Sequence, residues 1–276
     1  MAVLSGLQAA GQVLARHAGP ARWPDFDHAV APGGCAWCYL DALSDDGRHA
    51  LVAIVFIGSV FSPCCAWARR WARRWAQRGG GAAAGAPCPG ADPRNHVAVN
   101  VALYRTDGGP GERWAMTERG SAALQRSADT LAIGPSSLHR DGHARVLRLD
   151  EWTVPLPRRL RGTVRLHPLA RGLDSSIALE PRGLSSPIAL EPSGAHQWWP
   201  IAPCSRVEVD LTEPGWRWQG NGYLDSNRGP SPLEHSFGHW PWSRAALGDG
   251  RAGAGTAVGY DAHGLDASHT HLGPAF

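Results

Sequence analysis

Residues 37–61 read WCYLDALSDDGRHALVAIVFIGSVF and contain two predicted strands joined by a turn. The first strand covers Trp37 to Leu43, and Ser44 to Gly47 supplies the Ser, Asp and Gly residues that favour turns. The second strand is an apolar run from Ala50 to Phe61 that is rich in β-branched residues. This run is shorter than the about 20 residues that a membrane-spanning helix needs. We therefore expect a buried strand here, and any membrane contact would be peripheral.

The same alternation of strand and turn continues along the chain. Further strands are predicted at residues 96–104, 113–118, 146–149, 163–167 and 207–211. The 276 residues include 34 Gly and 22 Pro, which favours many turns over long helices. Short strands at regular spacing, separated by Gly, Pro and Asp, predict an all-β sandwich or barrel.

Composition and motifs argue against several classes of function. The formal net charge of +3 is too small to imply a nucleic-acid partner. The sequence has no phosphate-binding loop, no Gly-x-Ser-x-Gly elbow and no dinucleotide-binding glycine motif between a strand and a helix. The N-terminus lacks the basic region of a signal peptide, so we expect a reducing, cytoplasmic compartment.

Cysteine and histidine pairs give no convincing metal or cofactor site. Cys35 and Cys38 form a Cys-x-x-Cys pair without the strand and helix that would flank a thioredoxin-like motif. A zinc site would need a second ligand pair at suitable spacing. His269 and His271 have metal-like spacing, but the sequence shows no obvious partners for them. We therefore predict neither a metal nor a cofactor.

Two stretches, residues 67–90 and 171–192, are interpreted as insertions. The first begins with the repeat WARRWARR, which we interpret as a duplicated coding repeat exposed as a loop. A basic, Trp-bearing helix resting on an anionic membrane surface is the alternative. The second contains RGLDSSIALEP followed by RGLSSPIALEP, too few copies for a solenoid, and is expected to be a lengthened surface loop. Residues 1–23 are expected to form a short helix or a mobile segment.

The side chains that could carry chemistry concentrate between residues 194 and 244. His196 and Trp198 are two residues apart, as are Tyr223 and Asp225, so on strands each pair faces one side. A carboxyl buried among aromatic rings has a raised pKa and can donate a proton near neutral pH. Aromatic faces stabilise a desolvated cation by about 2 kcal/mol or more, and a neutral His can take a proton from water. Together these groups could hydrate an alkene through a carbocation, although alternating aromatics are also typical of an ordinary core.

The chain also resembles a known family, the carotenoid 1,2-hydratases, which are also called hydroxyneurosporene synthases. The resembling segments are residues 37–63, DPRNHVAVNVALY (92–104), RWAMTERG (113–120), IGPSSL (133–138), VPLPRRLRGTVRLHP (154–168), HQWWPIAPCSRVEVDL (196–211), GYLDSN (222–227) and WPWSR (240–244). They occur in family order, which makes the linked set specific. The resemblance implies lipocalin-like β-barrels in a tandem pair. We expect the first barrel, residues 24–245, to carry the site, and residues 246–276 to begin a second, incomplete barrel.

The resemblance further implies the reaction, which is addition of water to the C1=C2 double bond of acyclic carotenoids such as neurosporene or lycopene, without a cofactor. The family's His-x-Trp and Tyr-x-Asp segments match His196, Trp198, Tyr223 and Asp225 in this chain. Asp225 is expected to donate the proton to C2. Trp198 and Tyr223 would shield the cation at C1, and His196 would orient or deprotonate the attacking water. The expected substrate-binding residues are Trp199, Trp218, Trp240 and Trp242.

Two other functions fit the same features. The first is a non-catalytic lipocalin-like protein that binds carotenoid or another isoprenoid, or an inactive truncated copy of the enzyme. The second is a cyclase on the same scaffold that holds a folded substrate. Asp225 distinguishes them, because a carrier has no reason to bury a carboxyl group in an apolar pocket.

Overall fold

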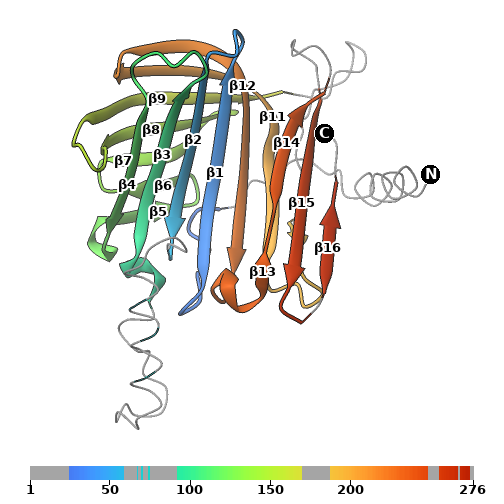
Figure 1. Cartoon of the computed structure of the whole chain (residues 1–276). Helices are drawn as coiled ribbons and strands as arrows, with labels where there is room; N and C mark the ends of the chain where they lie inside the picture. Colours follow the sequence, from blue (N-terminus) through green and yellow to red (C-terminus); the bar gives the residue numbers. More distant parts are fainter. Residues whose placement is uncertain are drawn as a thin grey trace.

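Strands make up most of the part of the protein that the computed structural model describes (Figure 1). The described residues are 25–58, 67, 70, 74, 92–169, 187–247, 255–266 and 268–273. The N-terminal segment 1–23, Cys64, Cys65, Cys88, most of the first repeat and residues 171–186 of the second lie outside these ranges. The all-β prediction is confirmed. No helix in the described ranges is both long enough and apolar enough to cross a lipid bilayer.

The larger sheet is antiparallel and has the strand order β4-β3-β2-β1-β12-β11-β9-β8-β7-β6-β5, with β10 beside β11. Its strands are β1 (Cys35–Ser44), β2 (His49–Ile57), β3 (Val97–Arg105), β4 (Arg113–Arg119), β5 (Leu124–Ser127), β6 (Thr130–Ile133), β7 (Ser136–Asp141), β8 (Ala144–Trp152), β9 (Arg159–Pro168), β10 (Ile188–Ala189), β11 (Gln197–Glu213) and β12 (Trp216–Gly229). Most of the strands predicted from sequence are present, and the observed strands are generally longer. Strands β5 to β7 were not predicted.

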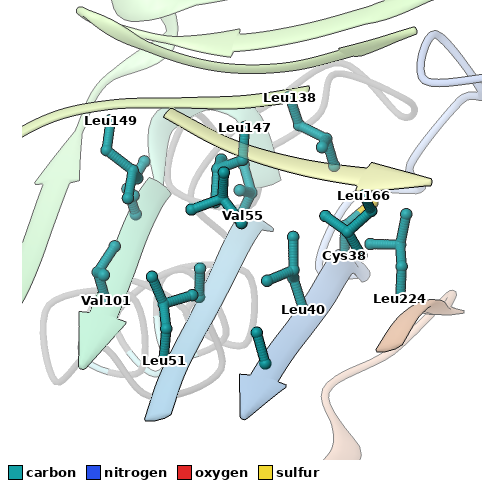
Figure 2. Close-up of a cluster of buried hydrophobic side chains, with 14 of the residues drawn as sticks. Cys38, Leu40, Leu51, Val55, Val101, Leu138, Leu147, Leu149, Leu166 and Leu224 are labelled. Carbon is teal, nitrogen blue, oxygen red and sulfur yellow. The ribbon is translucent and has the colours of Figure 1, made fainter. Parts of the chain in front are cut away.

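The larger sheet curls so that its two halves face one another across an apolar core (Figure 1). Figure 2 shows Leu147 and Leu149 of β8 opposite Leu51 and Val55 of β2. Every second residue of β1 to β3 points into this core, as period-2 alternation requires. The intervening residues of each strand point to the opposite face of the sheet, where they can make other contacts.

Strand β12 lies between β1 and β11 and presents different residues on its two faces. Leu224 points into the apolar core of the larger sheet. Tyr223 and Asp225 alternate with it and point to the opposite face, together with Asn227. Tyr39 of β1 is paired with Asp225 and therefore shares that face.

A second, smaller sheet covers this opposite face. It consists of β13 (Phe237–His239), β14 (Trp242–Ala246), β15 (Thr256–Gly264) and β16 (His269–Leu272). Val258 and Tyr260 of β15 pack with Trp198 and Tyr223 in a second hydrophobic cluster. The side chains of Asp225 and its neighbours are thus enclosed between the two sheets.

The described parts of the two predicted insertions differ from the expected loops. Trp67, Arg70 and Arg74 are helical and exposed, and the other residues of the first stretch lie outside the described ranges. Ala and Arg, which make up most of this repeat, have high helix propensities. At the end of the second stretch, β10 pairs with β11 and Leu190 is buried, so this end is not a surface loop. Ile188 and Leu190 of this end pack in the second cluster.

Candidate functional site

The carboxyl group of Asp225 accepts three hydrogen bonds in the space between the sheets. The indole N–H of Trp198 and the hydroxyl of Tyr223 donate to Oδ2, at 2.8 and 2.9 Å. Asn227 Nδ2 donates to Oδ1 at 3.2 Å. The three donors come from adjacent strands, because Trp198 of β11 is paired with Asn227 of β12. Three of the four residues predicted to be catalytic are therefore brought together.

Asp225 is only 2% exposed, and this burial controls its protonation. Burial raises the pKa of the Asp225 carboxyl to about 7, although the hydrogen bonds from Trp198 and Tyr223 act in the opposite direction. Burial also raises the pKa of the Tyr223 hydroxyl well above its usual value, so this hydroxyl remains a donor. At neutral pH a substantial fraction of Asp225 is therefore an un-ionised acid beside fixed donors.

Aromatic rings surround the carboxyl group. The ring centroid of Trp242 lies 5.0 Å from that of Tyr39 and 5.3 Å from that of Tyr223. On the other side, Trp198 and Tyr260 have centroids 5.4 Å apart. The Tyr260 hydroxyl donates to Asn227 Oδ1 at 3.4 Å, which orients the amide of Asn227 toward Asp225. We call Tyr39, Trp198, Tyr223, Trp242 and Tyr260 the aromatic cage.

A buried ion pair borders the aromatic cage. Arg244 of β14 contacts both carboxylate oxygens of Asp41 on β1, with Nε 3.2 Å from Oδ2. The Arg244 guanidinium carbon lies 5.7 Å from the centre of the Tyr223 ring. Because Asp41 balances the charge of Arg244, the cage does not face an uncompensated cation.

The fourth predicted catalytic residue, His196, does not contact Asp225. His196 directly precedes β11, and its ring lies against Gly229, which is four residues or roughly 13 Å along β12 from Asp225. Its Nδ1 lies 2.5 Å from Glu191 Oε1, and its Nε2 lies 3.1 Å from the Ser231 carbonyl oxygen. Since a carbonyl oxygen only accepts hydrogen bonds, Nε2 carries the hydrogen in its contact with Ser231. Nδ1 is in contact with the Glu191 carboxyl group. The expected contact of His196 with Asp225 is therefore not observed, because His196 lies beside Gly229 at the end of β12, whereas Asp225 lies four residues earlier on that strand.

The four predicted substrate-binding tryptophans divide between the two faces of the larger sheet. Trp240 and Trp242 pack in the cluster that contains the aromatic cage. Trp199 and Trp218 pack against the other cluster, on the face of the larger sheet opposite to Asp225. Trp199 also lines a cavity of about 950 Å³ whose wall includes Phe26 and Ser226. Asp225 does not line this cavity. Trp199 and Trp218 both pack on the other face of the larger sheet from the acid, so neither borders it.

Several residues of the site were not identified from the sequence. Asn227 lies two residues after Asp225, which is the same separation as that between Tyr223 and Asp225. Tyr39 and Asp41 form another Tyr-x-Asp segment. Period 2 could have indicated all three, since each continues a recognised strand face. Tyr260 and Glu191 had no such signal, because their positions depend on contacts between distant segments.

The cysteine pair of β1 does not form a chelating site. Cys35 and Cys38 are three residues apart on a strand, so their side chains leave opposite faces. Both carry buried thiols rather than a disulfide. Burial raises the pKa of the Cys38 thiol to about 12, which disfavours the thiolate that a metal ion would bind.

Comparison with known proteins identifies relatives of this chain. A model of the carotenoid hydratase CrtC family matches residues 53–276. The chain is 48% identical over 252 residues to an acyclic carotenoid 1,2-hydratase of Thiocapsa roseopersicina, which covers 90% of this chain and 53% of that protein. It is 47% identical over 243 residues to an acyclic carotenoid 1,2-hydratase of Rubrivivax gelatinosus, covering 86% and 50%. The chain thus spans about half the length of these relatives.

A solved structure shares the fold. A protein assigned as AttH from Nitrosomonas europaea superposes with a TM-score of 0.54 at 15% identity, covering 94% of this chain and 69% of that one. At this identity the likeness concerns the fold alone. It confirms the lipocalin-like architecture predicted from the sequence.

Proposed function

The chain belongs to the carotenoid hydratase CrtC family, and from this premise we propose that it is an acyclic carotenoid 1,2-hydratase. The reaction would add water to the C1=C2 double bond of a substrate such as lycopene or neurosporene. The observation that carries the proposal is the buried Asp225 carboxyl, held by three donors within the aromatic cage. A protein that only binds an apolar chain gains nothing from burying a carboxyl group there, because the burial costs free energy.

The hydrogen bonds of Asp225 indicate which of its two carboxyl oxygens carries the proton that is transferred. Oδ2 accepts from both Trp198 and Tyr223, whereas Oδ1 accepts from Asn227 alone among the residues that the structure describes. The acid proton is therefore best carried by Oδ1, which retains a free lone-pair direction. In the proposed step this proton bonds to C2 of the alkene, Asp225 becomes a carboxylate, and a tertiary cation is left at C1.

The aromatic cage suits the cation that this step creates. Ring faces attract a desolvated cation by about 2 kcal/mol or more, and five rings lie around the acid. Pairing of Arg244 with Asp41 reduces the repulsion that an isolated guanidinium would exert on the cation. The new carboxylate of Asp225 also stabilises the positive charge until water reacts.

Water completes the addition by forming a C–O bond to C1 and losing a proton. The Asp225 carboxylate is the base that we propose for that proton, which regenerates the acid. The indole N–H of Trp242 has no hydrogen-bond partner in the described ranges, so it is a candidate donor to the water oxygen. Both ring nitrogens of His196 are engaged with Glu191 and Ser231, and we assign His196 a positioning role instead of the expected role on water.

Substitution of Asp225 by Asn tests the proposal. The variant keeps the shape of the side chain but has no transferable proton. Its amide oxygen could still accept from Trp198 and Tyr223, and rotation of the Asn227 amide could satisfy the new NH₂ group. In a host that makes lycopene or neurosporene, the wild-type chain should yield a 1-hydroxy product and Asp225→Asn at least about 100-fold less.

The matched control is Asp210→Asn, the same chemical change on an exposed position of β11. This variant should retain wild-type turnover. Wild-type turnover by Asp225→Asn would remove Asp225 from the acid role. Carotenoid that co-purifies with the wild-type chain without any hydrated product would instead favour the carrier function.

We further propose a cytoplasmic protein that contacts the inner face of the membrane peripherally, where an apolar carotenoid would be found. Trp67, Arg70 and Arg74 support this contact, because all three are helical and exposed, and the Trp67 side chain is 68% exposed. Co-sedimentation with phosphatidylglycerol vesicles should fall in Trp67→Ala. Co-sedimentation should be unchanged in Trp152→Ala. This control also removes an exposed tryptophan, but one on β8 beside Arg159.

A further inference from the structure

The outer face of the smaller sheet carries a group of histidines and an aspartate, on the side away from the larger sheet. The group consists of Asp261 and His263 on β15, His269 and His271 on β16, and His239 on β13. Asp261 is paired with His271, and His263 is paired with both His269 and His239. Directly paired residues of antiparallel strands point to the same face. Five potential metal ligands therefore gather on one face of three adjacent strands, and we call them the histidine cluster.

The ligand atoms of the histidine cluster converge on the carboxylate of Asp261. His263 Nε2 lies 3.2 Å from Oδ2, His269 Nε2 contacts Oδ1, and His271 Nδ1 lies 3.7 Å from Oδ1. One ligand atom from each of Asp261, His263 and His269 lies within 4.8 Å of the others. The imidazole rings are stacked, with centroids 3.8 Å apart for His239 and His263 and 4.2 Å apart for His263 and His269.

From this geometry we propose that the histidine cluster binds one divalent transition-metal ion, such as zinc. Two imidazoles and a carboxylate form a typical zinc ligand set, and His271 or water can supply the fourth ligand. Zinc–ligand bonds of about 2.0–2.1 Å in a tetrahedron place neighbouring ligand atoms about 3.3 Å apart. The separation of 3.2 Å between His263 and Asp261 is already close to this value. The ligand atoms lie within 4.8 Å of one another, and side-chain rotations that shorten the longer separations to about 3.3 Å would complete the site.

The position of the histidine cluster indicates a structural ion. Asp261 and His263 point away from the larger sheet, whereas Tyr260 and Ala262 of the same strand pack against it. A bound ion would join β15 to β16. It would stabilise the strand that supplies Tyr260 to the aromatic cage, and it would not contact the reacting atoms. This proposal is independent of the proposed hydratase reaction.

Zinc titration of the whole chain, prepared without a polyhistidine tag, tests the proposal. Calorimetry with zinc chloride should give one tight site per chain, and the melting temperature should rise with zinc concentration. His263→Gln/His269→Gln should weaken zinc binding at least about tenfold. The control His139→Gln/His143→Gln changes one histidine of β7 and one of the turn between β7 and β8, and it should bind zinc as the wild type does. Equal zinc affinity in the wild type and His263→Gln/His269→Gln would overturn the proposal.

Cobalt absorption separates the histidine cluster from the six cysteines of the chain. A cobalt ion held by imidazole and carboxylate gives weak visible bands, whereas thiolate ligands add a strong near-ultraviolet charge-transfer band. The proposal expects only the weak bands from the wild-type chain, and a charge-transfer band would contradict it. This measurement needs no variant, so it remains decisive even if His263→Gln/His269→Gln folds poorly.

Discussion

At Asp225, burial and hydrogen bonding act on the same carboxyl group in opposite directions. Burial dominates and raises the pKa to about 7, while Trp198 and Tyr223 favour the charged form. The result is an acid that is strong enough to give up its proton and still holds it near neutral pH. In general, catalytic efficiency of this kind is greatest when the pKa lies near the working pH.

The pH dependence of turnover follows from this pKa. Because the proposed reaction needs the protonated carboxyl, kcat/KM should fall as pH rises through about 7. In Trp198→Phe the carboxyl loses a donor that lowers its pKa, so the pKa rises and the alkaline fall should move to higher pH. The measurement is kcat/KM for carotenoid hydration across the pH range on both sides of neutrality.

Trp199→Phe is the matched control for this prediction. Trp199 is the next residue of β11 and packs on the opposite face of the larger sheet, so its loss should leave the pH profile in place. If the pH profile moves equally in Trp198→Phe and Trp199→Phe, the alkaline fall in kcat/KM is not caused by titration of Asp225.

At the scale of the element, the two faces of β12 have different roles. One face packs the core through Leu224, and the other carries Tyr223, Asp225 and Asn227. Its last residue, Gly229, lies beneath the ring of His196. This close approach leaves no room for a side chain, so the glycine is required by packing and not by its backbone conformation.

We predict that Gly229→Ala destabilises the fold. The added methyl group would overlap the His196 ring, which Glu191 and the Ser231 carbonyl hold in place. Such overpacking typically costs about 1–3 kcal/mol in the free energy of unfolding. Urea denaturation measures this change. Gly120→Ala is the control, because its methyl group would meet open space, and a loss as large as that of Gly229→Ala would refute the packing argument.

At the scale of the whole molecule, the two sheets are joined by the second hydrophobic cluster and by one buried ion pair. Asp41 lies on the larger sheet and Arg244 on the smaller one. The side chains are 14% and 12% exposed, so the pair is largely removed from water. Burial raises the pKa of Asp41, and Arg244 and Tyr39 oppose that change. The pair therefore fixes how β14 lies over the aromatic cage.

A double-mutant cycle tests this link between the sheets. Arg244→Met leaves Asp41 buried without its partner, and we expect a loss of about 3–5 kcal/mol in the free energy of unfolding. Asp41→Asn should recover part of that loss, giving a coupling energy of at least about 2 kcal/mol. The exposed pair of Asp210 and Arg217 serves as the control cycle, with an expected coupling below about 1 kcal/mol. Equal couplings in the two cycles would mean that the buried pair does not hold the sheets together.

Much of the fold could be predicted from local patterns. The strand at residues 37–43 and the apolar run after it predicted β1 and most of β2, because alternation and β-branched residues act within a few neighbours. Strands β5 to β7 were missed because they are short and their burial patterns are weaker. The spacing of Tyr223 and Asp225 indicated a shared strand face, and the structure places them in contact.

The sequence by itself determined that this protein is made of strands and that a Tyr, an Asp and a Trp of the family's segments could share a face. Only the tertiary structure decided that this face lies beneath a second sheet, that His196 is directed to Glu191, and that Trp199 and Trp218 belong to the other side. The reason is that period 2 relates side chains along one strand. It does not specify where the partner strand pairs or which distant segment covers the face, since both depend on packing between residues far apart in the chain.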